Sequence, residues 1–353
     1  MIITRTPFRV TLGGGGTDLP SYYSRHGGFV FAAAISRYMF INVNRPVVDD
    51  LVRVKYTRSE IVSHRDAVQH EIAREALRMV GIECGVEIVS MADVPAGTGL
   101  GSSSCYAVGL LNALHAMRRQ PVTYHELAEE ACRLELDILK KPIGKQDQYM
   151  ASFGGLTVLE IEPDGRVHVS KPRVSQSALD DLQHNMLLFY TGVERSSQDI
   201  LREQSRGVAE KNNQTVDSMH AIKEMGYRIR EMIERGDLTS FGMALDAHWQ
   251  LKKRLSSKIS SPRFDELYDL ARRNGALGGK ISGAGGGGFL LLYTERRHAQ
   301  LREAMRRAGL REMRYHFDFE GTQVVANLTD GSYQTDWPRP ATMAAAAGVG
   351  ATA

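Results

Sequence analysis

A run of small residues, Pro95 to Ser104, has the composition of a loop that binds a phosphate group. It reads PAGTGLGSSS and lies between an expected strand and a long apolar segment that predicts a helix. Glycines let the backbone approach a ligand closely, and the start of a helix offers unpaired N–H groups and the positive end of its dipole. The lysine of the GxxxxGK[ST] loop is absent, so this is not a Walker loop. A tight strand-to-helix turn capped by serine is the simpler alternative.

Two further glycine-rich stretches adjoin expected strands. Gly13 to Gly16 is followed by Thr17 and Asp18, and Lys280 to Gly288 precedes the apolar run FLLLY. Consecutive glycines cost backbone entropy, so the later stretch indicates a backbone that passes close to phosphates or to another segment, rather than a flexible linker. A carboxylate after the earlier stretch either caps the turn or accepts hydrogen bonds from sugar hydroxyls.

Strands and helices must hold these loops in place, and the hydrophobic patterning predicts both kinds. Strands are expected at 1–12, 85–91, 156–161, 186–191 and 289–293, with an edge strand at 51–57 and two short strands within 28–44. Helices are expected at 66–80 with Gly81 as the C-cap, from 105 to about 119, from the capping box of Thr123 and Glu126 to about Leu139, and at 197–235, 237–256, 264–273 and 296–308.

Composition excludes several classes of protein. The 353 residues are 42% hydrophobic and 24% charged, with a formal net charge of +3, which argues against a dedicated nucleic-acid binder. We expect no membrane span and no signal peptide, because no apolar run approaches the required length. Three cysteines without a CxxC pair favour a reducing cytosol. The histidines show no metal-ligand spacing, and His70, His115 and His248 are expected at ordinary surface or core positions of helices.

The three glycine-rich loops, in this order, resemble those of the GHMP kinases, a family named for galactokinase, homoserine kinase, mevalonate kinase and phosphomevalonate kinase. The first motif is TPFRVTLGGGGTD at 6–18, the second is Pro95 to Ser104 and the third is Lys280 to Gly288, and the likeness spans about residues 4–325. The resemblance implies an α+β fold of two lobes, an N-terminal lobe like domain 2 of ribosomal protein S5 and a ferredoxin-like C-terminal lobe, with ATP and substrate in the cleft between them. We expect the lobes at 1–175 and 176–335 and a disordered low-complexity tail at 336–353.

The resemblance also implies catalytic roles. Asp147, in GKQDQY, matches the family's catalytic aspartate, which accepts or orients the proton of the acceptor hydroxyl; a surface-loop aspartate is the alternative. Arg9 matches a basic residue that stabilises charge on the transferring phosphoryl group or favours the charged form of Asp147. Glu135 matches the glutamate that binds Mg²⁺ in galactokinase, with Ser103 or a neighbouring serine as the partner ligand; a solvated helix position is the alternative for Glu135.

The same resemblance implies binding residues. ATP is expected to contact the second and third loops through Pro95, Gly97, Gly99, Leu100, Gly101, Ser102, Ser103, Ser104, Gly283 and Gly285. Thr17 and Asp18 are candidates for the sugar hydroxyls. Lys145, Arg195 and Ser196 are candidates for a substrate phosphate, since cationic side chains pair well with that anion. An ordinary surface position is the alternative for Arg195.

Within the family, the chain is most similar to the D-glycero-D-manno-heptose 7-phosphate kinases and to fucose kinase domains. The supporting strings are GGGGTDLP at 13–20, GKQDQYMASFGG at 144–155 and YTGVERSSQDIL at 190–201. Gly15 and Gly16 stand where galactokinases have larger residues, which leaves space for a bulkier or differently oriented sugar. The implied activity is cytoplasmic phosphoryl transfer from MgATP to the anomeric hydroxyl of the heptose phosphate, by a monomer or a homodimer. A 1-kinase for free fucose or galactose and an inactive sensor of sugar and ATP are the alternatives.

Overall fold

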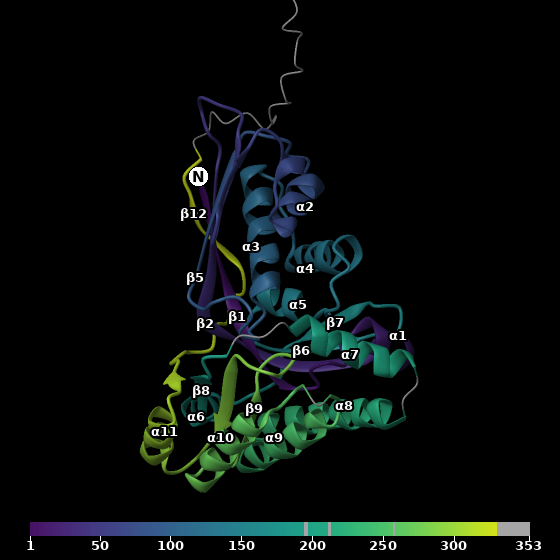
Figure 1. The fold of residues 1–353 in the computed structure, drawn as a ribbon, viewed down its shortest axis with the longest axis vertical. Helices are drawn as coiled ribbons and strands as arrows, with labels where there is room; N and C mark the ends of the chain where they lie inside the picture. The colour runs from purple at the N-terminus through teal and green to yellow at the C-terminus, as the bar shows by residue number, and fades with distance from the viewer. Residues whose placement is uncertain (194–196, 211–212, 257, 330–353) are drawn as a thin grey trace, which may run out of the picture.

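The computed structural model describes residues 1–193, 197–210, 213–256 and 258–329. Figure 1 shows a large sheet with its helices standing above a smaller sheet and a base of long helices. The α+β class predicted from the resemblance is confirmed, since helices and two mainly antiparallel sheets make up the described chain. The tail predicted at 336–353 lies outside the described residues.

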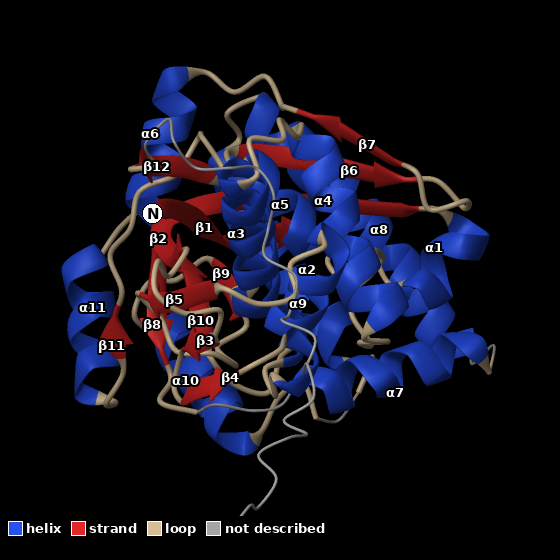
Figure 2. Cartoon of the chain, turned by 90° about the horizontal axis from the view of Figure 1, so that it is seen from above, coloured by secondary structure: helices blue, strands red, loops and turns tan. Residues whose placement is uncertain are grey.

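The larger sheet is built on two long antiparallel strands, β1 (Ile2–Gly13) and β2 (Gly28–Asn44). Its order is β12-β1-β2-β5-β3-β4, and β6 and β7 extend it from the beginning of β2. Figure 2 shows β6 and β7 reaching toward α1 (Pro20–His26), at the opposite side of the molecule from α11. The remaining strands are β3 (Val52–Lys55), β4 (Ser59–Val62), β5 (Val86–Ala92), β6 (Leu156–Ile161), β7 (Val167–Ser170) and β12 (Gln323–Asn327).

Two strand predictions are wrong, both because of long-range pairing. Residues 28–44 form one strand of 17 residues rather than two short ones. β2 pairs along its length with β1, and it pairs with β6 through its beginning and with β5 through its end. A register shift between Pro7 and Phe8 interrupts this ladder without ending it. β3, expected at an edge, lies between β5 and the unpredicted strand β4.

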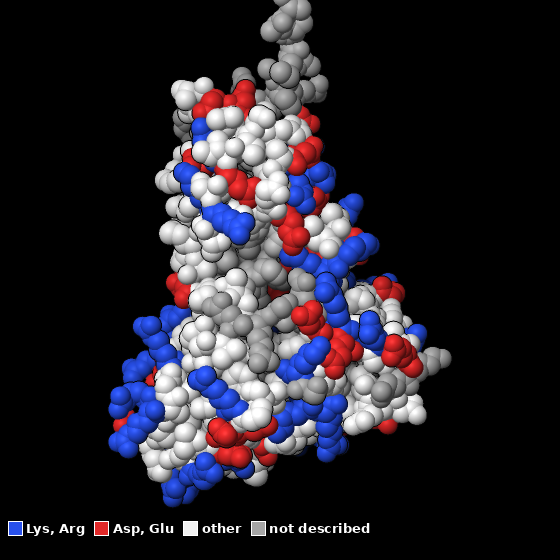
Figure 3. Space-filling model, viewed as in Figure 1, with Lys and Arg blue, Asp and Glu red and all other residues white. Residues whose placement is uncertain are grey.

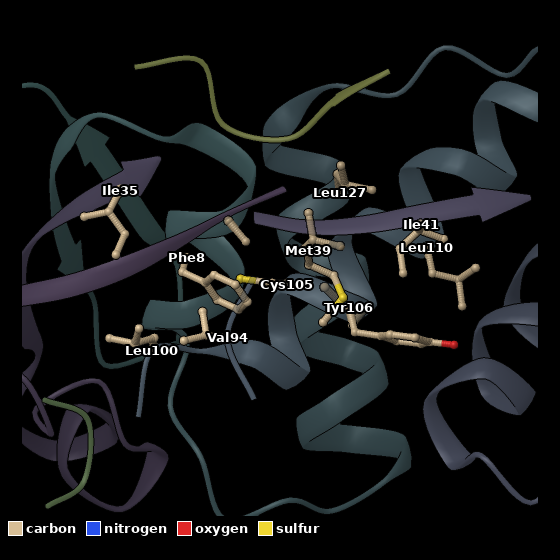
Figure 4. Close-up of a cluster of buried hydrophobic side chains, with 14 of the residues drawn as sticks. Phe8, Ile35, Met39, Ile41, Val94, Leu100, Cys105, Tyr106, Leu110 and Leu127 are labelled. Atoms are coloured by element: carbon tan, nitrogen blue, oxygen red, sulfur yellow. The ribbon is translucent and has the colours of Figure 1, made fainter. Parts of the chain in front are cut away.

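Helices cover one face of the larger sheet, with α3 at the centre (Figure 1). They are α2 (Glu71–Val80), α3 (Ser102–Met117), α4 (Tyr124–Cys132) and α5 (Gln146–Phe153). The capping box of Thr123 and Glu126 is confirmed, and after α4 the chain continues as a π-helical turn, Arg133–Ile138. In Figure 4, Phe8 of β1 points toward Cys105 of α3, beside Leu100. Burial of these apolar side chains fixes the start of α3 relative to β1.

The smaller sheet has the order β11-β8-β10-β9, and α9 packs against its strand β9. Its strands are β8 (Met186–Tyr190), β9 (Gly278–Ile281), β10 (Phe289–Tyr293) and β11 (Arg311–Glu312). The helices that follow α5 in the chain are α6 (Gln176–Asn185), α7 (Ser197–Ala209), α8 (Asn213–Glu234), α9 (Leu238–Lys253), α10 (Pro262–Arg273) and α11 (His298–Arg307). The helix predicted over 197–235 is therefore two helices, α7 and α8.

Elements from the C-terminal half of the chain also contact the larger sheet. β12 follows α11 in sequence yet pairs with β1 in the larger sheet. α8 packs against β1 and β2, and Gly226 of α8 lies so close that a Cβ there would come within 3.0 Å of the Gly14 nitrogen. These contacts hold the first glycine-rich loop against the C-terminal half. The residue ranges expected for the two lobes stay a prediction.

The surface carries charges of both signs. On the face seen in Figure 3, Lys and Arg side chains are interspersed with Asp and Glu, with a more basic group at the lower left, where α11 lies. Within the described residues, no helix combines the length and the apolar character that a membrane crossing requires.

Candidate active site

A cavity of about 270 Å³ lies where the three glycine-rich loops meet. The first loop contributes Gly15, Gly16 and Asp18, the second contributes Gly97, Gly99, Gly101, Ser102 and Ser103, and the third contributes Gly283 and Ala284. Arg9, Thr11, Gln146 and Asp147 complete the wall on the side of the larger sheet. Residues far apart in the sequence thus surround one space with donors, glycines and two carboxylates.

Arg9 and Asp147 form the central ion pair of this cavity. The Arg9 guanidinium on β1 donates from Nε and Nη2 to Asp147 Oδ1, each at 2.7 Å, and from Nη1 to the Gly99 carbonyl at 2.7 Å. Gln146 Nε2 donates to the same Oδ1 at 3.0 Å. Within the described residues, no donor reaches Asp147 Oδ2. One oxygen is therefore fixed, and the other is left to accept a hydrogen bond from a ligand.

Asp18 ties the first loop to the start of α5. Its Oδ1 accepts the Gly16 N–H and its Oδ2 accepts the Gln146 N–H, both at 3.0 Å. Burial raises the pKa of Asp18, and the backbone hydrogen bond from Gln146 opposes that shift. A Cβ at Gly144 would lie 2.0 Å from Oδ2, so only glycine fits there. Asp18 lines the cavity, but most of its hydrogen-bonding capacity already organises the loop.

The Thr17 side chain bonds to neighbouring backbone groups rather than facing the cavity. It is fully buried, its hydroxyl lies within hydrogen-bond distance of the Gly14 and Phe29 carbonyls, and it accepts the Phe29 N–H. It does not line the cavity. The structure therefore brings Asp18, but not Thr17, to the cavity.

The second and third loops pack backbone against backbone. Gly99 and Gly283 both have positive φ, and a Cβ on Gly99 would lie 2.6 Å from the Ser282 carbonyl oxygen. A Cβ on Gly288 would lie 2.0 Å from the Thr98 carbonyl oxygen. The close approach of two backbones explains these glycines. Gly101, Ser102 and Ser103 at the start of α3 line the cavity. The first N–H groups of a helix lack partners within it, so this position suits an anion.

Four of the residues expected to contact ATP do not line this cavity. Leu100 is fully buried in the core beside Phe8, and Ser104 is buried against Glu135. The Pro95 carbonyl accepts the Thr98 hydroxyl, and Gly285 packs against Ile259. Leu100 and Ser104 thus anchor the loop to the core, and the contacts of all four with ATP stay a prediction.

Glu135 lies beneath the start of α3. Its carboxylate is fully buried and accepts hydrogen bonds from Ser103 Oγ at 2.7 Å, Ser104 Oγ at 2.6 Å and Gln148 Nε2 at 2.7 Å. Lys141 Nζ lies 3.5 Å away. The alternative of a solvated helix position is therefore wrong.

A carboxylate beside a hydroxyl fits Mg²⁺ that arrives with a nucleotide, because Mg²⁺ prefers oxygen ligands and takes few of them from the protein. Ser103 faces the cavity and Glu135 lies directly behind it. No group of three or more His, Cys, Asp and Glu side chains in the described ranges could cage a metal ion. The site suits a metal shared with phosphates rather than one held by the protein alone.

Lys145, one of the candidates for a substrate phosphate, is not brought to the cavity. Lys145 Nζ donates to the Glu129 carboxylate at 2.9 Å and 3.1 Å and to the Gly165 carbonyl at 2.7 Å. These partners hold it away from the cavity lining. Arg195 and Ser196 lie outside the described residues.

Sequence reasoning missed several cavity residues, among them His248 and Lys252 of α9 and Lys280 of β9. Burial, together with the charge of Arg9, lowers the pKa of Lys252 to about 8. Burial also lowers the pKa of Lys280, and the pKa of His248 falls well below its usual value because burial acts together with the two lysines. The spacing of four residues between His248 and Lys252 was the available signal, since it places both on one helix face.

The sequence matches two family descriptions in order. Residues 67–155 match the N-terminal domain of GHMP kinases, and residues 229–310 match the C-terminal domain of GHMP kinases. A D-glycero-alpha-D-manno-heptose 7-phosphate kinase from Campylobacter jejuni is 29% identical over 308 residues, covering 83% of this chain and 89% of the relative.

Two further relatives extend the comparison. An L-fucokinase/L-fucose-1-P guanylyltransferase from Bacteroides fragilis is 27% identical over 84% of this chain, which corresponds to 35% of that longer protein. The crystal structure of a D-glycero-D-manno-heptose 1-phosphate kinase from Bacteroides thetaiotaomicron superposes with a TM-score of 0.75 at 23% identity, over 91% of this chain and 98% of the other. At that identity the likeness concerns the fold. The two domain matches, the fold of the whole chain and the meeting of the three loops around one cavity all lead to the same conclusion. The chain belongs to the GHMP kinase family.

Proposed function

We propose that this protein is an ATP-dependent sugar kinase that phosphorylates the anomeric hydroxyl of D-glycero-D-manno-heptose 7-phosphate and releases the 1,7-bisphosphate. The observation that carries the proposal is the link from Asp147 through Arg9 to Gly99. It joins a carboxylate with one open oxygen to the loop that faces the phosphates. The similarity to the Campylobacter heptose 7-phosphate kinase supports this choice of sugar.

The chemistry needs an aligned hydroxyl and a neutralised triphosphate. Asp147 Oδ2 accepts the proton of the anomeric hydroxyl, whose oxygen forms a bond to the γ-phosphorus while the bond to the bridging oxygen breaks and ADP leaves. Arg9 offsets negative charge beside the phosphate loop. Asp18 accepts a hydrogen bond from a sugar hydroxyl, and Ser103 and Glu135 would hold the Mg²⁺ that accompanies ATP. That ion supplies charge neutralisation on the phosphates.

A 1-kinase for free fucose or galactose is the second candidate, and the similarity to the Bacteroides fucokinase favours it. A Cβ at Gly16 would meet nothing closer than 3.8 Å, so the first loop leaves room for several sugars. An inactive sensor is disfavoured, because binding alone gives no reason for a carboxylate with one oxygen fixed and one open. The three cysteines are buried and form no disulfide bond, which supports the reducing cytoplasm as the place of the reaction. A homodimer stays a prediction.

The test is ADP release measured with a panel of sugars and sugar phosphates. We expect kcat/KM for the heptose 7-phosphate to exceed that for the free heptose by on the order of 10²-fold or more, because a remote dianion adds binding energy that positions the reacting hydroxyl. Equal efficiency with both would overturn the phosphorylated acceptor and favour the free-sugar kinase. No ADP release with any sugar would favour the sensor.

Replacing Glu135 with glutamine is expected to raise the Mg²⁺ concentration for half-maximal activity by about 10-fold, while the sugar KM changes less. The amide introduced by this substitution presents a donor where the carboxylate accepted three hydrogen bonds. Mg²⁺ titrations at saturating sugar measure the effect. Ser103→Ala should shift the titration more than Ser104→Ala, because Ser103 faces the cavity and Ser104 is buried. An unchanged titration in Glu135→Gln would leave Glu135 a purely structural role.

A further inference from the structure

Three basic side chains line one wall of the cavity, and none of them has a carboxylate within 4 Å in the described part of the chain. His248, Lys252 and Lys280 are 1%, 8% and 2% exposed. α9 supplies the first two and β9 supplies the third, and α9 packs directly on β9. The three nitrogen-bearing groups form a buried cluster of basic side chains that the catalytic scheme above does not use.

The lysines of this cluster use little of their hydrogen-bonding capacity. Lys252 Nζ donates to the Gly283 carbonyl, and Lys280 Nζ donates to the Leu12 carbonyl at 3.0 Å. Each ammonium has three N–H donors, and across the described ranges neither lysine forms an ion pair with a carboxylate within 4 Å. Each therefore has donors left for a ligand.

His248 has no partner at all among the described residues. Both of its ring nitrogens are buried and make no hydrogen bond. A buried polar atom without a hydrogen bond is destabilising, so two such atoms on one ring in a cavity wall indicate a ligand that they contact. The cations that act on its titration are Lys280 and Lys252, which surround it with positive charge.

We propose that His248, Lys252 and Lys280 form a subsite for a phosphate dianion on the α9–β9 wall of the cavity. A dianion would supply the missing countercharge, accept the spare ammonium donors and accept an N–H from the His248 ring. The subsite rests on the proposed function in one respect, namely that a phosphorylated ligand enters this cavity. It takes over the role that sequence reasoning gave to Lys145, which Glu129 and Gly165 hold elsewhere.

Two phosphate groups have this chemistry. One is the phosphate that the acceptor sugar already carries. The other is the phosphoryl group in transfer, because Lys252 is within electrostatic range of Arg9 and bonds the carbonyl of Gly283, which packs on Gly99 of the phosphate loop. The two sources predict different kinetics.

Lys252→Met removes the charge and keeps the length of the side chain, and Lys252→Arg keeps the charge. We expect Lys252→Met to lower kcat/KM for the heptose 7-phosphate by about 10-fold or more, the scale of one lost charge-assisted hydrogen bond, and Lys252→Arg to recover part of the loss. A loss confined to the phosphorylated sugar assigns the subsite to the acceptor phosphate. An equal loss with phosphorylated and free sugar, again recovered by arginine, assigns it to the phosphoryl group in transfer.

The matched control is Lys253→Met. Lys253 is the next residue of α9, but its Nζ lies 3.2 Å from Asp265 and it does not line the cavity. Its kinetics should remain those of the wild type. Unchanged kcat/KM in Lys252→Met would overturn the subsite, as would a loss that arginine does not recover.

Binding of inorganic phosphate to the full chain, measured by calorimetry, tests the subsite without catalysis. We expect Lys252→Met to weaken phosphate binding by about 10-fold or more and Lys253→Met to leave it unchanged. If Lys252→Met does not fold, phosphate binding by His248→Gln tests the subsite instead. That substitution removes no hydrogen bond within the described structure. Phosphate affinity equal to that of the wild type in the folded variant would overturn the subsite. Failure of the proposed function would look different, because the wild type would turn over no sugar while phosphate binding still responded to these changes.

Discussion

Replacing Asp147 with asparagine is expected to lower kcat by about 10²–10⁴-fold while ATP still binds, the range typical of losing a general base. Arg9 and Gln146 donate to Oδ1 and will hold the oxygen of the amide in that place. The amide nitrogen then replaces Oδ2, the open oxygen that accepts the hydroxyl proton. A donor stands where the reaction needs an acceptor, and the phosphate loop is unchanged.

The measurement is kcat with saturating sugar, together with the ATP dissociation constant from calorimetry. Asp137→Asn is the matched control, because Asp137 is an exposed carboxylate in the segment before α5 and does not line the cavity. It should keep the kcat of the wild type. An Asp147→Asn enzyme with more than half of the wild-type kcat would rule out Asp147 as the base.

The glycine-rich loops could be recognised from the sequence because the need for glycine at these positions shows directly in the residue type. Gly99 and Gly283 need positive φ and room for a neighbouring backbone, and no other residue type supplies both. The start of α4 at Thr123 and the end of α2 at Gly81 were also predictable, since helix caps are short-range interactions. Sequence reasoning therefore located the phosphate loop and the loop that packs on it.

The buried cations could not be found in the same way. Lys252 and Lys280 resemble ordinary charged residues in sequence, and their burial arises only when α9 packs on β9 and both close on β1. His248 was expected to be an ordinary helix residue for the same reason. Likewise, no local sequence pattern indicates that β12 pairs with β1, or that β2 continues unbroken from its pairing with β6 to its pairing with β5. Long-range packing decides these features.

Replacing Gly101 with valine is expected to weaken ATP binding by on the order of 100-fold or more, the scale of losing two charge-assisted hydrogen bonds to phosphate. Gly101 is the N-cap of α3 with φ 86° and ψ 27°, in the left-handed region that branched side chains avoid. A Cβ there would lie 3.2 Å from Asp147 Cγ. The substitution therefore turns the first N–H groups of α3 away from the phosphates and presses on the catalytic carboxylate.

Gly81→Val separates this local effect from a general loss of stability. Gly81 is the C-cap of α2 with φ 75° and ψ 33°, nearly the same backbone conformation, and a Cβ there would meet only the flexible end of Arg118. Strain in this region costs about 1–3 kcal/mol at either position, so both variants should unfold at a lower temperature than the wild type. Only Gly101→Val should lose ATP affinity, measured by calorimetry on folded protein. Wild-type affinity in a folded Gly101→Val protein would mean that 95–104 is a strand-to-helix turn and that ATP binds elsewhere.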